Sequence, residues 1–160
     1  VVGLDLAVEK EELRYHVLLY NSILGGSANS KMFQNVREKA HLAYAASSSY
    51  VRYKNNIFIN CGIEIDNYQK ALHLIKEQIE AMKKGVFTEE IENAKKGIIS
   101  GIEAIGDEQD TQIVYYFGQE LSQEKISIEE YKEKVMQVSK ENILAIANKV
   151  TIDTIYFLKN

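Results

Sequence analysis

The sequence of 160 residues contains no proline and only one cysteine, Cys61. Average usage would supply about eight prolines in a chain of this length, so Gly, Asn, Asp and Ser have to make the turns. A single cysteine excludes both an internal disulfide and a zinc site built from cysteine thiolates. It also suits a reducing compartment, and we therefore expect the protein to be cytoplasmic.

Long apolar runs and an excess of positive charge are also missing. No run of about 18 apolar residues occurs, so the sequence predicts no membrane-spanning helix. The chain has 23 acidic and 19 basic side chains, a formal net charge of −4. Because nucleic acids and anionic membranes attract basic surfaces, we expect neither as a partner. Hydrophobic residues at 46% and charged residues at 26% are typical of a globular protein and exclude disorder.

The spacing of apolar residues predicts an α+β fold. Val2, Leu4, Leu6 and Val8 alternate with other residues, which is typical of a strand with one buried face. Later patterns predict helices at 10–24 and 30–39, strands at 44–53 and 57–65, helices between 66 and 150, and a last strand at 154–158. This order favours helices covering one face of a mainly antiparallel sheet.

Local signals place the ends of several elements. Gly25-Gly26 is expected to stop the first long helix, and Asp66 and Ser127 are expected to cap later helices. The length suits a single domain spanning residues 1–160. Because Val1 already lies in a predicted strand, we expect the chain to be a piece of a longer, two-domain polypeptide.

Candidate sites have to be weighed against ordinary structural roles. The three histidines, His16, His41 and His73, show no i, i+4 pairing, so we expect no metal site in this chain. The aromatic and basic cluster from Tyr50 to Lys54 could stack bases. No RNA-recognition signature surrounds it, however, and we interpret it as the solvated end of a hairpin.

One segment, from Ile23 to Tyr50, resembles a known family. The matching elements are Leu24-Gly25-Gly26, Ser30-Lys31-Met32-Phe33, Val36-Arg37-Glu38-Lys39 and Leu42-Ala43-Tyr44. Together they are similar to the second half of the insulinase/pitrilysin-type zinc peptidases, the inverzincins, which include mitochondrial processing peptidase. The predicted order of elements fits this resemblance over the whole chain.

The resemblance implies a division of labour between two similar α+β halves that close around an extended peptide. The first half carries the zinc motif H-x-x-E-H, and the second half faces the zinc across the cavity. In the second half, an Arg and a Tyr seven residues apart bind the substrate, and here these are Arg37 and Tyr44. A peptide carbonyl attacked by water develops negative charge, which a guanidinium and a phenol can stabilise as donors.

The zinc motif itself is absent where the resemblance would place it. The corresponding stretch is near His16-Val17-Leu18-Leu19-Tyr20, and only its first histidine matches. We therefore expect no catalytic residue and no cofactor in this segment, which would be inactive alone. Zinc is expected in an N-terminal half or in a partner subunit, and a second copy of the chain is a further candidate partner.

The sequence is compatible with three functional hypotheses. The first is a non-metal-binding half of a zinc metallopeptidase that embraces the peptide substrate and contributes Arg37 and Tyr44. The second keeps the fold without catalysis, as an inactive structural or partner subunit. The third is a free-standing module that binds RNA or protein, which the acidic charge balance disfavours.

Overall fold

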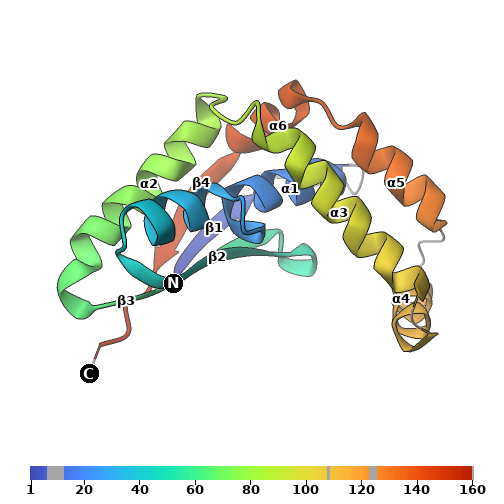
Figure 1. The fold of residues 1–160 in the computed structure, drawn as a ribbon, viewed down its shortest axis with the longest axis horizontal. Coiled ribbons are helices and arrows are strands. Elements are labelled where there is room, and N and C mark those ends of the chain that lie inside the picture. Colours follow the sequence, from blue (N-terminus) through green and yellow to red (C-terminus); the bar gives the residue numbers. More distant parts are fainter. Residues whose placement is uncertain (7–12, 108, 123–125, 160) are drawn as a thin grey trace.

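The computed structural model describes residues 1–6, 13–107, 109–122 and 126–159 (Figure 1). The strands are β1 (Val2–Leu6), β2 (Ala43–Val51), β3 (Asn56–Ile63) and β4 (Val150–Ile155). The α-helices are α1 (Arg14–Asn21), α2 (Tyr68–Lys83), α3 (Glu90–Asp107), α4 (Gln109–Ser122), α5 (Ile128–Gln137) and α6 (Lys140–Ala147). Shorter segments are the π-helical η2 (Ser22–Gly26) and η3 (Met32–Lys39) and the 3₁₀ turns η4 (Arg52–Lys54) and η5 (Ile65–Asn67).

The strands form one sheet in the order β2-β3-β1-β4, and every neighbouring pair is antiparallel. β2 and β3 make the predicted hairpin, with Val51 opposite Asn56 at the turn. Asn55 closes the turn with a φ of 49°, in the left-handed region that Asn tolerates better than most residues. The predicted hairpin is therefore confirmed.

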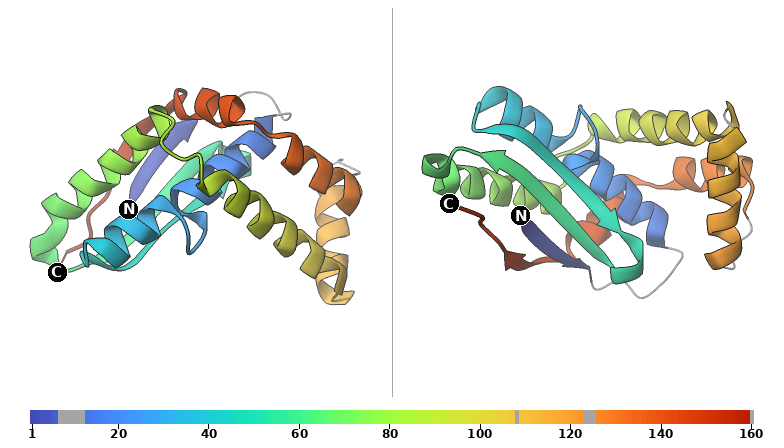
Figure 2. Two further views of the ribbon diagram at one scale, coloured as in Figure 1. Left: turned by 45° about the horizontal axis from the view of Figure 1, so that its top comes forward. Right: turned by 90° about the horizontal axis from the view of Figure 1, so that it is seen from below.

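Helices cover one face of this sheet (Figure 2). Ala45, Ser47 and Ser49 of β2 alternate with Ala46 and Ser48 and are exposed. The strand side chains on the opposite, helix-facing side are buried: Val2, Leu4, Ala46, Ser48, Ile57 and Ile59. The predicted α+β fold, with helices on one face of an antiparallel sheet, is confirmed.

Several predicted boundaries are wrong. Asp66 lies in η5, and α2 begins after it with Asn67 as an N-cap that makes no side-chain capping bond. The last strand begins at Val150, earlier than the predicted 154–158, because α6 ends at Ala147 and its β-branched successors pair with β1. The cap at Ser127 is confirmed, since its Oγ accepts the N–H of Glu130 at 3.0 Å.

α3, α4 and α5 form an arm that extends beyond the sheet (Figure 1). Lys95 of α3 donates to the carbonyl of Met136 in α5 at 3.0 Å, which ties these two helices together. α4 lies across their far ends (Figure 2, right). The C-terminal end of the predicted first strand and the N-terminal part of the predicted first helix, at residues 7–12, lie outside the described residues.

Candidate functional site

The segment that carries the family resemblance folds as α1, η2, η3 and β2. η2 continues directly from α1, so the chain stays helical through Gly26. The predicted stop at Gly25-Gly26 is therefore wrong in its reason, because neither glycine has a positive φ. Gly25 is required by packing instead: a Cβ atom there would lie 2.5 Å from the backbone nitrogen of Ser48. The backbone of the helical segment therefore packs directly against the backbone of the edge strand β2.

Asn21 and Ser48 hold this close approach in register. The Oγ of Ser48 donates to Oδ1 of Asn21 at 2.8 Å, and both residues are buried. A buried hydrogen bond of this kind fixes the two elements because losing one partner leaves the other unsatisfied.

Lys31 connects this segment to the start of α3. Its Nζ lies 2.8 Å from Oε1 of Glu90, 59 residues further along the chain. Lys31 is buried, and the side chain of Glu90 is partly exposed. A buried cation requires such a partner, so the ion pair explains why a lysine can stand between the fully buried Ser30 and Met32.

Arg37 lies near the end of η3 with its side chain open to solvent. Its guanidinium carbon is 4.5 Å from the centroid of the Phe33 ring, a cation–π contact one turn earlier. Its Nε is 3.6 Å from Oε1 of Glu38. The side chain is 41% exposed, which leaves room for a further acceptor.

The turn after η3 directs the chain into β2. His41 has a φ of 51°, and the N–H of Leu42 donates to the carbonyl of Val36 at 3.2 Å. This closes the helix end in the manner of a left-handed C-terminal cap. The predicted positions of Arg37 at the end of a helix and of Tyr44 at the start of the next strand are confirmed.

Tyr44 lies at an irregularity in the β2–β3 ladder. Ala43 pairs with Ile63 and Ala45 pairs with Gly62, so Tyr44 is the extra residue of β2. The side chain is 71% exposed, and its phenol donates to Oε1 of Glu64. This hydrogen bond, together with the charge of the carboxylate, raises the pKa of Tyr44 and keeps the phenol protonated.

The structure therefore brings a cation and a phenol to the same junction, between η3 and β2, each with its own protein partner. A phenol has one proton to donate, and here Glu64 accepts it. A ligand oxygen that is to receive a hydrogen bond from Tyr44 has to displace Glu64.

The stretch expected to match a lost zinc motif lies in α1. Leu19 and Tyr20 are fully buried in the core, and burial raises the pKa of the Tyr20 phenol. His16 is partly buried, which lowers its pKa, while His41 lies in the turn after η3 and His73 on α2. Within the part of the chain that the structure describes, no three His, Cys, Asp or Glu side chains are placed to hold a metal ion. The residues that the structure describes therefore do not fit zinc.

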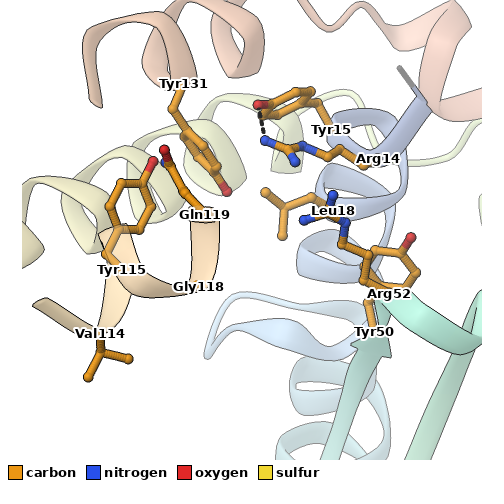
Figure 3. Close-up of a pocket in the computed structure, with 10 residues that line it drawn as sticks. All are labelled: Arg14, Tyr15, Leu18, Tyr50, Arg52, Val114, Tyr115, Gly118, Gln119 and Tyr131. Carbon is orange, nitrogen blue, oxygen red and sulfur yellow. Dashed lines mark hydrogen bonds between the residues drawn. The ribbon is translucent and has the colours of Figure 1, made fainter. Parts of the chain in front are cut away.

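A hollow with a volume of about 370 Å³ lies between α1 and the hairpin tip on one side and α4 and α5 on the other (Figure 3). Arg14, Tyr15 and Leu18 line it from α1, while Tyr115 and Tyr131 line it from the arm. Tyr50 and Arg52 of the predicted solvated hairpin end also line it and are half-buried, so that interpretation is wrong for these two residues.

Aromatic contacts give this hollow its shape. The rings of Tyr15 and Tyr131 meet edge to face with centroids 5.2 Å apart. Burial raises the pKa of Tyr131 to about 12. The guanidinium of Arg14 lies over the Tyr15 ring at 4.6 Å and donates to its hydroxyl. Only the number of tyrosines in the sequence, ten, hinted at such a cluster, because its members come from distant segments.

Comparisons with known proteins agree with the resemblance. The family model "Peptidase M16 inactive domain" matches residues 4–98. The chain is 37% identical, over 99% of its length, to the "Probable inactive metalloprotease YmfF" of Bacillus subtilis, and it spans 38% of that protein. It is 33% identical, over 59% of its length, to the "Uncharacterized zinc protease YmxG" of the same organism and spans 23% of it.

Solved structures show the same fold. A conserved protein from Enterococcus faecalis V583 superposes with a TM-score of 0.87 at 27% identity, covering 94% of this chain and 36% of that one. A peptidase M16 inactive domain from Pseudomonas fluorescens superposes with a TM-score of 0.76 at 20% identity, covering 94% and 39%.

The chain thus spans little more than a third of the length of several relatives. Among the described residues, no helix is long and apolar enough to cross a membrane. The expected cytoplasmic location stays a prediction. Taken with the fold and the family match over residues 4–98, these likenesses establish that the chain belongs to the peptidase M16 family, as its inactive domain.

Proposed function

We propose that this domain is the non-metal-binding half of a zinc metallopeptidase, which holds a peptide substrate against a zinc-binding half located elsewhere in the full-length protein or in a partner subunit. Arg37 and Tyr44 are the residues of this half that bind the scissile region. The observation that carries the proposal is their placement: both are exposed at the η3–β2 junction, and the described part of the chain has no fitting zinc site of its own.

The chemistry of the two side chains suits a peptide carbonyl. The zinc-binding half would supply the metal and the activated water, which are outside this chain. As negative charge develops on the carbonyl oxygen, the guanidinium of Arg37 donates charge-assisted hydrogen bonds to it. Phe33 restricts the guanidinium from one side, so less side-chain entropy is lost on binding.

Tyr44 can donate a second hydrogen bond to the carbonyl oxygen only after its hydroxyl has broken its hydrogen bond to Glu64. A tyrosine phenol is protonated at neutral pH with or without Glu64 as its acceptor, so Tyr44 acts as a donor and not as a base. The exposed position of the pair makes this exchange of acceptors inexpensive, since water can solvate Glu64 when it is released.

An inactive partner subunit is the second candidate function. It is favoured by the name of YmfF, a probable inactive metalloprotease that matches nearly the whole of this chain at 37% identity. In that case another subunit would carry out hydrolysis, and this domain would complete the enclosure. An H-x-x-E-H motif in the remaining part of the full-length protein would favour the first candidate, because an inactive partner subunit has no zinc motif on its own polypeptide.

The test uses the full-length protein with its zinc-binding half. We expect Arg37→Ala and Tyr44→Phe each to lower kcat/KM by about 10- to 100-fold with zinc content unchanged, because a charge-assisted hydrogen bond contributes about 1.5–3 kcal/mol. Arg37→Lys should restore little, since a point charge cannot reproduce the planar fork. The two losses should be less than additive if both donors serve one oxygen.

Matched controls come from neighbouring or similar exposed residues. Lys39→Ala removes an exposed cation two residues from Arg37, and Tyr156→Phe removes a phenol from a 57% exposed tyrosine. Neither should change kcat/KM. Wild-type rates in both Arg37→Ala and Tyr44→Phe would show that this pair does not bind the substrate.

A further inference from the structure

The outer side of α4 exposes a stripe of large apolar residues. Ile113, Tyr116 and Phe117 follow the i, i+3, i+4 spacing of one helix face and are 61%, 50% and 64% exposed. Val114 lies at the border between this stripe and the hollow of Figure 3, which it also lines, and is 71% exposed. Side chains of this size together expose on the order of several hundred Å², the area at which apolar patches mark interaction sites.

The inner side of the same helix faces the rest of the domain. Tyr115, Gly118 and Gln119 face the hollow shared with α1 and α5 (Figure 3). Gln119 fixes this orientation, because its side chain donates to the carbonyl of Ile126 at 3.0 Å and accepts from the N–H of Ile126 at 3.2 Å. The helix therefore cannot turn its outer stripe inward without breaking these bonds.

An acidic residue lies near each end of the outer stripe. Asp110 precedes Ile113 by three residues and Glu120 follows Phe117 by three, so both lie on this side of α4, and residues 109–122 contain no Lys or Arg. Between residues 103 and 134 the sequence has nine acidic and three basic side chains. A second copy of the chain docking through the same face would bring two acidic rims together, which disfavours it.

We infer that the outer side of α4 docks on the other half of the full-length protein, at an apolar surface with a basic rim. The lengths of the relatives indicate what would cover this surface. The chain spans 38% of YmfF and 36% of the Enterococcus faecalis structure, so most of each relative lies outside the matched domain. The inference rests on the proposed pairing of two halves but not on peptide cleavage.

Hydrogen exchange of the α4 amides in the full-length protein tests this docking. We expect exchange in Phe117→Lys to be at least about 10-fold faster than in the wild type, equivalent to about 1.4 kcal/mol of lost protection. Phe117→Glu should accelerate exchange less, because a basic rim tolerates an added carboxylate. Lys and Glu are better helix formers than Phe, so faster exchange would report lost docking and not a weaker helix.

Val86 provides the matched control. It is 59% exposed and precedes the opposite end of α3, so Val86→Lys and Val86→Glu should leave α4 exchange unchanged. Equal α4 exchange in the wild type and both Phe117 variants would overturn the inference, since the outer side would then be open. Equal acceleration by Lys and Glu would overturn the inference that the docking surface has a basic rim. A dimer that Phe117→Lys dissociates in sedimentation would show that the outer side of α4 binds a second copy of the chain instead. Failure of the proposed function is read separately, from the rates of the Arg37 and Tyr44 variants.

Discussion

Replacing Gly25 by alanine tests whether close packing of η2 on β2 maintains this fold. The added Cβ would lie 2.5 Å from the backbone nitrogen of Ser48, 2.7 Å from its Oγ and 2.9 Å from its Cβ. Ordinary contacts begin at about 3.4–4 Å, so the two segments have to separate by roughly 1 Å. Because one clashing atom belongs to the backbone of a paired strand, a side-chain rotation cannot relieve the overlap.

The expected cost follows from two effects. Overpacking of a core costs about 1–3 kcal/mol. Separation also weakens the buried Ser48–Asn21 hydrogen bond of 2.8 Å, and an unsatisfied buried partner costs about 1–3 kcal/mol. We expect Gly25→Ala to lower the free energy of unfolding by about 2–4 kcal/mol. For a chain of this size, that corresponds to a decrease in Tm of about 5–15 °C.

Thermal and urea unfolding followed by circular dichroism measure this change. Gly97→Ala is the matched control, since Gly97 lies in α3 and a Cβ added there would meet no atom within 4 Å. Alanine at this position should stabilise the helix by up to about 1 kcal/mol. Ser48→Gly in the Gly25→Ala background should restore only part of the loss, because the backbone nitrogen stays in place. A Gly25→Ala variant as stable as the wild type would refute the packing argument.

Three further changes follow from the same structure. Glu90→Gln should lower stability by about 3 kcal/mol, because it leaves the buried Lys31 ammonium without its counter-charge, and Lys31→Met in that background should recover most of the loss in urea unfolding. Tyr20→Phe should leave stability unchanged or raise it by about 1 kcal/mol, since the buried Tyr20 hydroxyl has no hydrogen-bond partner among the described residues; a loss above this amount would contradict the prediction. Burial raises the pKa of Tyr131 from an ordinary 10 to about 12 in the folded protein. The contribution of this phenol to the free energy of unfolding is therefore fully present below pH 10 and is lost as the pH rises through 12. Tyr131→Phe should flatten the decline of Tm across this window.

Periodicity in the sequence was sufficient to predict most elements of the fold. The alternation of Ile57 and Ile59 with Phe58 and Asn60 describes a strand buried on one face, and the structure buries the two isoleucines. Ser127 predicts a helix start because its hydroxyl bonds to an amide three residues away. Such signals are local, since they depend on spacings within one strand or one helical turn. Boundaries that depend on a distant partner, such as the start of β4 opposite β1, were predicted wrongly.

The candidate site likewise combines features that local sequence predicts with contacts that depend on distant segments. Its place at a helix–strand junction and the spacing of Arg37 and Tyr44 follow from the sequence and the family resemblance, and the structure bears out the junction. Their immediate partners do not follow, because Glu64 meets Tyr44 only after β3 returns along β2.

Contacts between residues far apart in the chain were determined by tertiary packing alone. Gly25 reads locally as a helix stop, and only the position of Ser48 shows that it makes room for a strand. The sequence around Lys31 would predict an exposed side chain, and its burial depends on the ion pair with Glu90. A spacing of two or about 3.6 residues specifies which face of a strand or helix is apolar. Which atoms pack against that face depends on contacts between segments that are far apart in the sequence.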